Sequence, residues 1–430
     1  MKNVDIARKY EDYIIAQRRY FHENPELSGK EYDTVKKIAS ELDSMGIPYV
    51  EIEEGGILAT IRGCRDNGRA VLLRADIDAL AVTETDENLK FKRTCKSKND
   101  GVMHACGHDG HTAMLLGAAR ILLEKREELE GTVYLCFERG EEGGGNGCFI
   151  LKYLDDNKIH IDTVYAMHLF SKIDSGKLAI NDGPMMASMM VFGVTIEGKG
   201  GHGSRPDLSS SPIDAFVAIY NGLSAMRLTK IDPYKSLTYS IGSVKAGDAH
   251  NIIPQSLSFK GTMRTFDRDG AGMTFHREMK RLIDGVCELY GCRAVYEKYT
   301  EPGIPVINDT ECAVFARDVL GAELGRDNII NAEPWMASEP FSQFLYMWPG
   351  VFAFLGVKNE EKGIGAEHHN PYFDIDEDVL YKGSAAAATY AIEFLKSDID
   401  TSDRKFKGGY REVLLKSERA EKYDLLYRKE

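Results

Sequence analysis

Three histidines and a cysteine lie within eight positions of one another in the segment MHACGHDGHTAM, which begins at Met103. Cys106 and His108 are two residues apart in a glycine-containing loop, so a thiolate and an imidazole can converge there on one cation. Asp109 suits the N-cap of the helix that should follow. We expect His104 and His111 to orient the ligands without touching a metal. The spacing predicts a metal site.

Two adjacent carboxylates, Glu141 and Glu142, follow the apolar run GTVYLCF. Neighbouring side chains on an extended chain point in different directions, so one can bind metal while the other moves protons. A solvated acidic turn is the alternative. His168 lies near the end of the run TVYAMHL, and His369 lies in the polar segment EHHNPYF. Five donors are together sufficient for a dinuclear hydrolytic centre: Cys106, His108, Glu142, His168 and His369.

Short β-rich runs alternate with helical stretches around these residues. The runs YVEIE, ILATI, AVLLRAD, GTVYLCF and TVYAMHL predict strands, with two helices before Ser44 and a third from Gly110 to Lys125. The order predicts an α/β fold with a mixed, largely parallel sheet flanked by helices. Asp76 and Asp78 share one face of their strand, and we expect both to support the metal loop without binding the metal.

A second set of patterns occupies the middle of the chain. From Met185 to about Thr300 the order is β-α-β-β-α-β, the signature of a split βαβ sandwich, after which helix, apolar strand and helix return. We therefore predict a discontinuous catalytic domain over residues 1–184 and 300–400, and an inserted α/β lid domain over 185–299. The charged C-terminal extension, 401–430, is expected either to form an amphipathic helix that docks or self-associates, or to be a solvated tail.

Composition argues against nucleic-acid binding, secretion and a membrane span. The 430 residues include 54 Lys and Arg against 67 Asp and Glu, a formal charge of −13, which opposes nucleic-acid binding. Eight scattered cysteines favour reduced thiols, and the N-terminal MKNVDIARKYEDYI lacks the apolar core of a secretory signal, so a cytoplasmic protein is expected. The most hydrophobic stretch, Met347 to Val357, is too short to span a bilayer and predicts a buried strand.

Nine ordered motifs resemble those of dinuclear-metal amidohydrolases that cleave N-acyl amino acids. These are aminoacylase-like, hippurate-hydrolase-like and auxin-conjugate-hydrolase-like enzymes, relatives of zinc carboxypeptidases with a lid or dimerisation domain. The resemblance extends to about residue 396. Its motifs are RRYFHENPELSGKE from Arg18, LLRADIDAL from Leu72, HACGHDGHTAMLLGAA from His104, GEEGGG from Gly140, MHLF from Met167, GKGGHGSRP from Gly198, AGDAHNIIPQ from Ala246, GTMRTF from Gly261 and HHNPYFDIDEDVL from His368.

The resemblance implies roles for individual residues. It implies the same five metal ligands, with His369 preferred to His368 because the family's ligand stands two positions before the proline, and it makes Glu141 the catalytic base. His202 in the lid would be the oxyanion partner, although it could simply brace a glycine turn. Asn251 and Arg264 would grip the substrate carboxylate, although Arg264 could pair with a lid carboxylate instead. Two divalent ions are implied, zinc first and manganese, nickel or cobalt as alternatives, together with a homodimer formed through the lid.

Three positions depart from the family pattern. Glu138-Arg139 stand where Gln-Pro is usual, Ala81 where proline is usual, and Pro340 where aspartate is usual. We expect these positions to line or shape the substrate pocket.

Three hypotheses follow. The first is a metal-dependent amidohydrolase acting on small N-acyl or N-aroyl amino acids or peptide-like conjugates. The second is a thiol hydrolase in which Cys106 is the nucleophile and His108 or His111 its base. The third is a binding protein without catalytic activity, which the presence of Glu141 beside a complete ligand set argues against.

Overall fold

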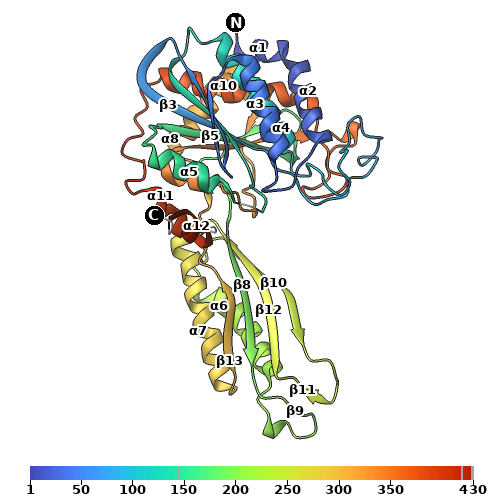
Figure 1. The fold of residues 1–430 in the computed structure, drawn as a ribbon. Coiled ribbons are helices and arrows are strands. Elements are labelled where there is room, and N and C mark those ends of the chain that lie inside the picture. The colour runs from blue at the N-terminus through green and yellow to red at the C-terminus, as the bar shows by residue number, and fades with distance from the viewer. Residues whose placement is uncertain (144, 418–419, 428–430) are drawn as a thin grey trace.

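A computed structural model describes residues 1–143, 145–417 and 420–427 of the chain. In this part, eight strands form one mixed sheet, and its central strands β4, β3, β5 and β16 run parallel to one another (Figure 1). The predicted mixed, largely parallel α/β sheet is confirmed. In spatial order the strands are β1 (Tyr49–Ile52), β2 (Gly56–Arg62), β4 (Glu130–Glu138), β3 (Arg65–Asp76), β5 (Thr163–Asp174), β16 (Gly350–Lys358), β6 (Leu178–Ala179) and β15 (Ile329–Ile330).

Helices cover both faces of this sheet. Side chains alternate along each strand, so each strand contributes apolar residues to a core on either face. On β2, Ile57 and Ala59 belong to one core, and Leu58 between them belongs to the other. The first core packs against α1 (Asn3–Lys9), α2 (Glu11–Glu23), α3 (Tyr32–Met45), α4 (His108–Glu124), α8 (Thr310–Leu324) and α10 (Leu380–Lys396). The second packs against α5 (Gly147–Asp156) and α9 (Ser342–Met347).

The N-terminal segment holds three helices where the sequence predicts two. The additional break falls at Tyr10, whose backbone leaves the helical conformation between α1 and α2. Ile6 and Ala7 before the break and Ile14 after it are all buried in the same core. The apolar periodicity therefore continues across the break and does not reveal it.

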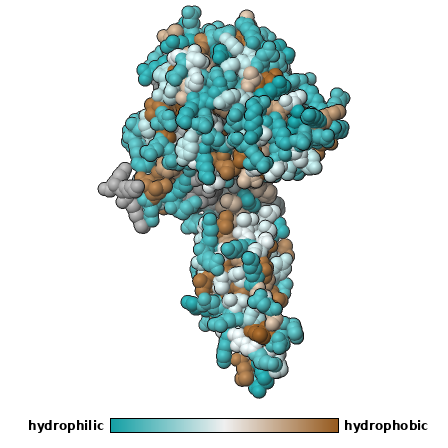
Figure 2. All heavy atoms as spheres, turned by 45° about the vertical axis from the view of Figure 1, so that its right-hand side comes forward, coloured by the Kyte–Doolittle hydropathy of each residue, from teal (hydrophilic) through white to brown (hydrophobic). Residues whose placement is uncertain are grey.

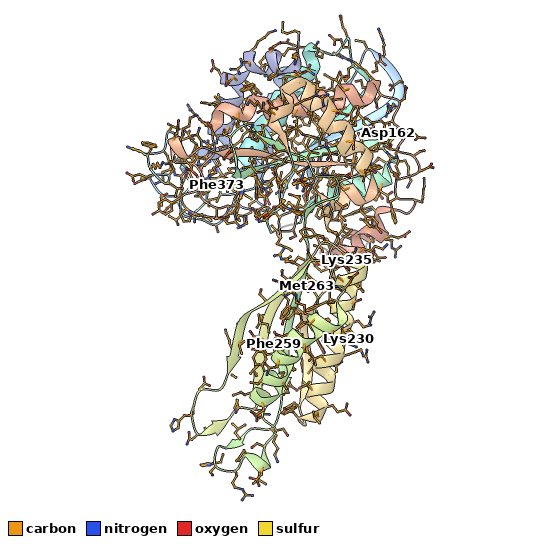
Figure 3. The ribbon with its side chains drawn as sticks, turned by 180° about the vertical axis from the view of Figure 1, so that it is seen from behind. Asp162, Lys230, Lys235, Phe259, Met263 and Phe373 are labelled. Atoms are coloured by element: carbon orange, nitrogen blue, oxygen red, sulfur yellow. The ribbon has the colours of Figure 1, made fainter. Side chains whose placement is uncertain are left out.

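An inserted unit over residues 188–299, called the lid below, projects away from the large sheet (Figure 1). Its elements are β8 (Ser188–Glu197), α6 (Pro212–Lys230), β10 (Leu237–Ala246), β12 (Ser256–Thr265), α7 (Met273–Leu289) and β13 (Arg293–Tyr299). This is the predicted β-α-β-β-α-β order. The strands form an antiparallel sheet in the order β10-β12-β8-β13. Phe259 and Met263 of β12, labelled in Figure 3, are fully buried in the core that this sheet shares with both helices.

Short strands join the lid to the large unit and form its far tip. Near the junction, β7 (Pro184–Met186) pairs with β14 (Val306–Ile307), and at the opposite end β9 (Gly201–His202) pairs with β11 (Ile252–Ile253). The nitrogen of Trp335 donates to the carbonyl of Met185 at 2.8 Å, so the loop that carries Trp335 is tied to the entry of the lid.

The C-terminal extension packs against the large unit. Its helices are α11 (Tyr410–Lys416) and α12 (Tyr423–Tyr427), while residues 418–419 and 428–430 of the predicted extension lie outside the described residues. Tyr410, Val413 and Leu414 are fully buried in the second core. The Tyr410 hydroxyl also lies 2.8 Å from Oε1 of Gln343 on α9, to which it donates. A solvated tail is therefore wrong for α11, and docking is the observed arrangement.

On the face drawn in Figure 2, the surface of the large unit is mostly hydrophilic, whereas apolar side chains recur along the lid. Within the described residues, no helix combines the length and the apolar character needed to cross a bilayer. The domain boundaries themselves stay predictions.

Candidate metal centre

The donor side chains converge near the ends of β3 and β4, at the start of α4 and beside the middle of β5. Cys106 lies in the loop before α4, His108 is the first residue of that helix, and His168 lies on β5. Their donor atoms all lie within 4.8 Å of one another, and so do those of Cys106, Glu142 and His369. Cys106 belongs to both groups. The arrangement offers two neighbouring positions for a cation, with the cysteine sulfur between them.

Hydrogen bonds fix which nitrogen of each buried imidazole faces the centre. Asp78 Oδ1 lies 3.0 Å from His108 Nδ1, and the Leu169 carbonyl lies 2.6 Å from His168 Nδ1. In each ring, Nε2 remains on the side of Cys106, and His168 Nε2 is 3.5 Å from the sulfur. His108 Nε2 is buried without a hydrogen-bond partner among the described residues. Both nitrogens are thus oriented as metal ligands usually are.

The two histidines at positions 368 and 369 occupy different surroundings. His369 has a φ of +61°, unusual for a residue other than glycine, and its Nε2 lies 3.0 Å from Glu142 Oε1. The His368 ring stacks on Phe170 and packs against Phe373, which is labelled in Figure 3. Burial lowers the pKa of His368 to about 3. Its Nδ1 is 3.8 Å from the Cys106 sulfur, but His369 is the histidine whose donor atom lies within reach of both Cys106 and Glu142.

His111 and His104 flank the donors and have different surroundings. His111 Nδ1 lies 2.5 Å from Asp76 Oδ1, and its Nε2 accepts from the Leu169 nitrogen at 2.8 Å, so both ring nitrogens are already engaged. His104 is buried, and neither of its ring nitrogens has a hydrogen-bond partner among the described residues. Burial lowers the pKa of His104 to about 4, which favours a neutral ring.

Asp109 does not cap α4, contrary to the sequence prediction. Gly107, with a φ of +94°, occupies the N-cap position, and Asp109 lies inside the first turn. The Asp109 carboxylate instead pairs with the Arg18 guanidinium at 2.9 Å and with His22 Nδ1 at 2.8 Å. Sequence reasoning missed both partners, although both stand in the motif RRYFHENPELSGKE. Arg18 and His22 thus hold the start of the helix that carries His108.

The pKa shifts of two acidic groups at the centre, Glu141 and Cys106, agree with a cation site. Burial, then Glu339 and Glu142, raise the pKa of Glu141 well above its ordinary value. Burial, then Glu142, likewise raise the pKa of the Cys106 thiol. Divalent cations offset such effects by stabilising the carboxylate and thiolate forms. With imidazole, thiolate and carboxylate donors gathered in one place, the residues present fit bound divalent cations.

The sequence model of the family described as "Peptidase family M20/M25/M40" matches residues 72–393, three quarters of the chain. The chain belongs to this family. It is therefore a hydrolase of the M20 type, in agreement with the resemblance seen in its motifs.

Individual M20 relatives are similar along nearly the whole chain. Thermostable carboxypeptidase 2 of Saccharolobus solfataricus is 38% identical over 90% of this chain and 97% of its own length. An IAA-amino acid hydrolase of Arabidopsis thaliana is 34% identical over 92% and 89%. A Bacillus subtilis protein whose crystal structure is described as a dinuclear metal binding peptidase from the M20 family is 32% identical, with a TM-score of 0.75 over 90% and 99% of the two chains.

Glu138, one of the positions that depart from the M20 pattern, forms a buried charge network behind the donors together with Glu339. The Arg74 guanidinium donates to Glu138 at 2.6 Å and to Asp76 at 2.7 Å, and lies 3.1 Å from Glu339. Glu138 and Glu339 are buried, and burial raises the pKa of Glu339 to about 7. We expected Glu138 to line or shape a pocket. Because Asp76 also binds His111, Glu138 and Glu339 instead support the centre from behind.

Two of the remaining departures, Arg139 and Pro340, adjoin this network in the sequence. Arg139, next to Glu138, donates to buried Glu31 at 2.9 Å, while Ala81 is exposed. Pro340 follows Glu339 and is buried.

The lid residues predicted for the site are not gathered at it within one chain. His202 on β9 and Asn251 beside β11 lie at the far tip of the lid, exposed (Figure 1). His202 Nδ1 lies 2.7 Å from the Ser204 hydroxyl, and the Asn251 carbonyl accepts from the nitrogen of Gly203. Arg264 pairs with Met189 at the near end of the lid sheet. Because β12 runs from the tip to the junction, Asn251 and Arg264 stand at opposite ends of it.

Arg264 does reach the large unit. Its Nη1 donates to the Ser338 hydroxyl at 3.1 Å, one residue before Glu339. It is the one member of the predicted lid set that lies beside the M20 donor cluster in the same chain.

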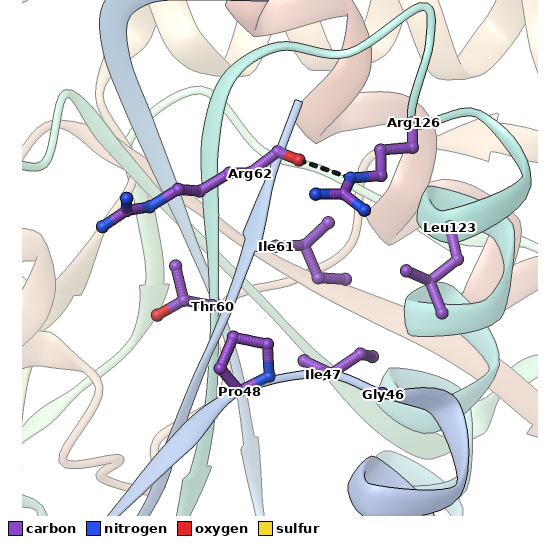
Figure 4. A pocket seen from close by; sticks show the side chains of 8 residues that line it. All are labelled: Gly46, Ile47, Pro48, Thr60, Ile61, Arg62, Leu123 and Arg126. Atoms are coloured by element: carbon purple, nitrogen blue, oxygen red, sulfur yellow. Dashed lines mark hydrogen bonds between the residues drawn. The ribbon is translucent and has the colours of Figure 1, made fainter. Parts of the chain in front are cut away.

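A separate pocket lies far from this chemistry. Its walls include Ile47, Ile61 and Leu123, with the carbonyl of Arg62 accepting from Arg126 (Figure 4). Leu123 is 15 residues along α4 from His108, or about 22 Å at the helical rise. No histidine, cysteine or carboxylate lines this pocket, so it is not the reaction site.

Proposed function

We propose that the chain is a metal-dependent amidohydrolase that cleaves the amide bond of N-acyl or N-aroyl amino acids and similar small conjugates. The observation that carries the proposal is the shared position of Cys106 between two donor groups, with Glu141 beside them. Cys106, His108, Glu142, His168 and His369 would hold two divalent ions. Thiolate and imidazole donors favour zinc, with manganese, nickel and cobalt as alternatives. The names of the carboxypeptidase and IAA-amino acid hydrolase relatives agree with a substrate that contains an amino acid.

When bound, divalent ions of this kind polarise a carbonyl and lower the pKa of water. The chain supplies the proton transfer. Glu141 accepts a proton from the attacking water and delivers it to the leaving amine, acting first as a general base and then as a general acid. Asp78 supports this step because it orients His108 and accepts from the nitrogen of Glu142 at 2.9 Å.

His202 would serve the site of a second copy of the chain. Strand β8 is ten residues long, so the tip lies about 30 Å from the junction. The donors lie near that junction, since the Trp335 ring is 6.2 Å from His168 and its backbone pairs with Met185. Rotation of a rigid lid about the junction preserves the distance between junction and tip, and therefore does not bring His202 to its own donors. In a homodimer, the lid of one copy can instead place His202 beside the donors of the other copy.

The lid surface supports this homodimer. Ile213, Val217 and Tyr220 repeat at helical spacing along α6 and are 40%, 51% and 52% exposed. Strand β10 is an edge of the lid sheet, and an unpaired edge of this kind can be covered by a second chain.

The thiol-hydrolase hypothesis is weaker. Burial raises the pKa of Cys106, whereas a nucleophilic cysteine needs a lowered one.

The test is hydrolysis of N-acetyl and N-benzoyl amino acids by the metal-loaded enzyme and its Glu141→Gln variant. Loss of a general base should lower kcat by about 10²- to 10⁴-fold, with metal content unchanged. Glu53→Gln, at an exposed glutamate, is the matched control. Normal turnover by metal-loaded Glu141→Gln would show that Glu141 is not the base. Activity that resists chelator and is lost on alkylation would favour the thiol mechanism.

A further inference from the structure

The loop over residues 140–143 carries the proposed base, and side chains from a distant part of the chain hold its backbone. Gly140, with a φ of +68°, turns the chain away from the end of β4. Its nitrogen donates to Glu31 Oε1 at 2.8 Å, and the nitrogen of Gly143 donates to the Ser28 hydroxyl at 3.0 Å. Both acceptors lie just before α3, so one short segment holds the loop near its two ends.

Glu31 is the residue at which most of these bonds meet. Its side chain is fully buried. Oε1 accepts from the nitrogens of Gly29 and Gly140, at 2.7 and 2.8 Å, and Oε2 accepts from Arg139 Nε at 2.9 Å. A buried carboxylate keeps its charge only where a positive charge and hydrogen bonds replace the lost water. Arg139 supplies that positive charge.

Arg139 has further contacts that fix its own position. Its Nη2 donates to the Gly29 carbonyl at 3.1 Å, and its backbone nitrogen donates to the Gly55 carbonyl at 3.0 Å. The guanidinium carbon lies 4.8 Å from the centre of the Tyr32 ring, a cation–π contact. The residue that begins the turn into the loop is therefore held through both its side chain and its backbone.

Glu142, the metal-binding neighbour of the base, has separate support. Its nitrogen donates to Asp78 Oδ2 at 2.9 Å, and its Oε1 lies 3.0 Å from His369 Nε2. Loss of the contact between Glu31 and Arg139 would release the loop before the base and leave these contacts of Glu142 in place. The effect should therefore fall on proton transfer and leave metal binding largely intact.

We propose that Glu31 and Arg139 are positioning residues for the reaction, which act by fixing the backbone immediately before Glu141. The proposal rests on the proposed function, in which Glu141 is the general base. Such a base must lie within hydrogen-bond reach of the water whose proton it takes, so even a small displacement of Glu141 lowers kcat. Both positioning side chains are buried, and both act through Glu141.

The experiment measures kcat and KM of metal-loaded variants on the N-acetyl or N-benzoyl amino acid that wild type cleaves faster. Glu31→Gln and Arg139→Gln should each lower kcat about tenfold or more, with KM and metal content nearly unchanged. Arg65→Gln is the matched control, because it breaks an exposed pair of the same kind, with Glu130 at 2.9 Å. Unchanged kcat in both variants, or a loss of metal that accounts for the loss of kcat, would overturn the proposal.

A double variant separates positioning from general damage to the protein. If Glu31 acts through Glu141, adding Glu31→Gln to Glu141→Gln should lower kcat by less than about twofold further, because the base is already absent. A further loss as large as that seen in the wild-type background would show that Glu31 acts independently of the base, and would overturn the proposal. Melting temperatures identify a variant that has failed to fold, and Arg139→Gln then carries the same test.

Hydrogen exchange of the loop amides separates this proposal from the proposed function. The amide of Gly140 should exchange faster in Glu31→Gln and Arg139→Gln than in wild type, and Arg65→Gln should match wild type. Equal exchange in all four proteins contradicts the anchoring of the loop. If wild type hydrolyses neither substrate, the proposed function is wrong, and the anchoring is then judged by this exchange alone.

Discussion

Asp78 joins two donors of the candidate centre, because its Oδ1 lies 3.0 Å from His108 Nδ1 while its Oδ2 accepts from the backbone nitrogen of Glu142. One buried carboxylate therefore sets both the tautomer of the imidazole and the position of the loop that carries Glu141 and Glu142. It does so from immediately beyond the end of β3, two residues after Asp76.

The variant Asp78→Asn should weaken metal binding. An amide has one acceptor oxygen where the carboxylate has two, so one of the two hydrogen bonds is lost. Loss of such a supporting partner typically costs about 10- to 100-fold in metal affinity. Competition with a chromogenic chelator measures the change, with exposed Asp398→Asn as the control. Unchanged affinity in Asp78→Asn would show that Asp78 does not orient the ligands.

His22 should make stability depend on pH. Burial and Arg18 oppose its charged form, but Asp109 and Glu84 outweigh them and raise its pKa above 6.5. For a histidine with a raised pKa, the stabilisation is complete below the unfolded-state value of 6.5 and is lost as pH rises through the folded-state value.

The measurement for His22 is urea unfolding of chelator-treated protein from pH 6 upward. The free energy of unfolding of wild type should fall with rising pH more steeply than that of His22→Gln. Identical slopes in the two proteins would refute this role of His22.

The C-terminal extension should contribute to the stability of the large unit. Leu414 is fully buried and its neighbour Leu415 is 50% exposed, so the two offer a matched pair. Leu414→Ala should lower the free energy of unfolding by about 2 to 5 kcal/mol, and Leu415→Ala should change it by no more than about 0.5 kcal/mol. Chemical denaturation of both variants measures these changes in the free energy of unfolding. Equal small effects would mean that α11 does not contribute to the core in solution.

Much of this arrangement follows from local pattern. Strand β5 was predicted from the apolar run TVYAMHL, although the strand continues past His168 to Asp174. Arg18 and His22 were not assigned to the site, because they meet Asp109 across about 90 residues and helical periodicity does not report such a contact. The distance between His202 and the donors was not predicted either. The motif that contains His202 does not reveal how long the lid strands are.

We expect His202 in the lid of one copy to complete the active site of the other copy. His202→Ala and Glu141→Gln should each be nearly inactive as pure proteins. Mixed dimers of the two contain one site with an intact Glu141 from one copy and an intact His202 from the other. Random mixing should therefore restore about a quarter of the wild-type rate, since half of the dimers are mixed and each has one intact site of two. Activity no higher than the sum of the two variants would contradict a site shared between copies.

The most direct test of the central claim is the number of divalent ions bound per chain, measured by elemental analysis after dialysis. If Cys106 stands between two donor groups, wild type should hold about two ions per chain, and Cys106→Ala should hold clearly fewer while remaining folded. Metal content near zero in wild type, with hydrolysis unaffected by chelator, would contradict the account.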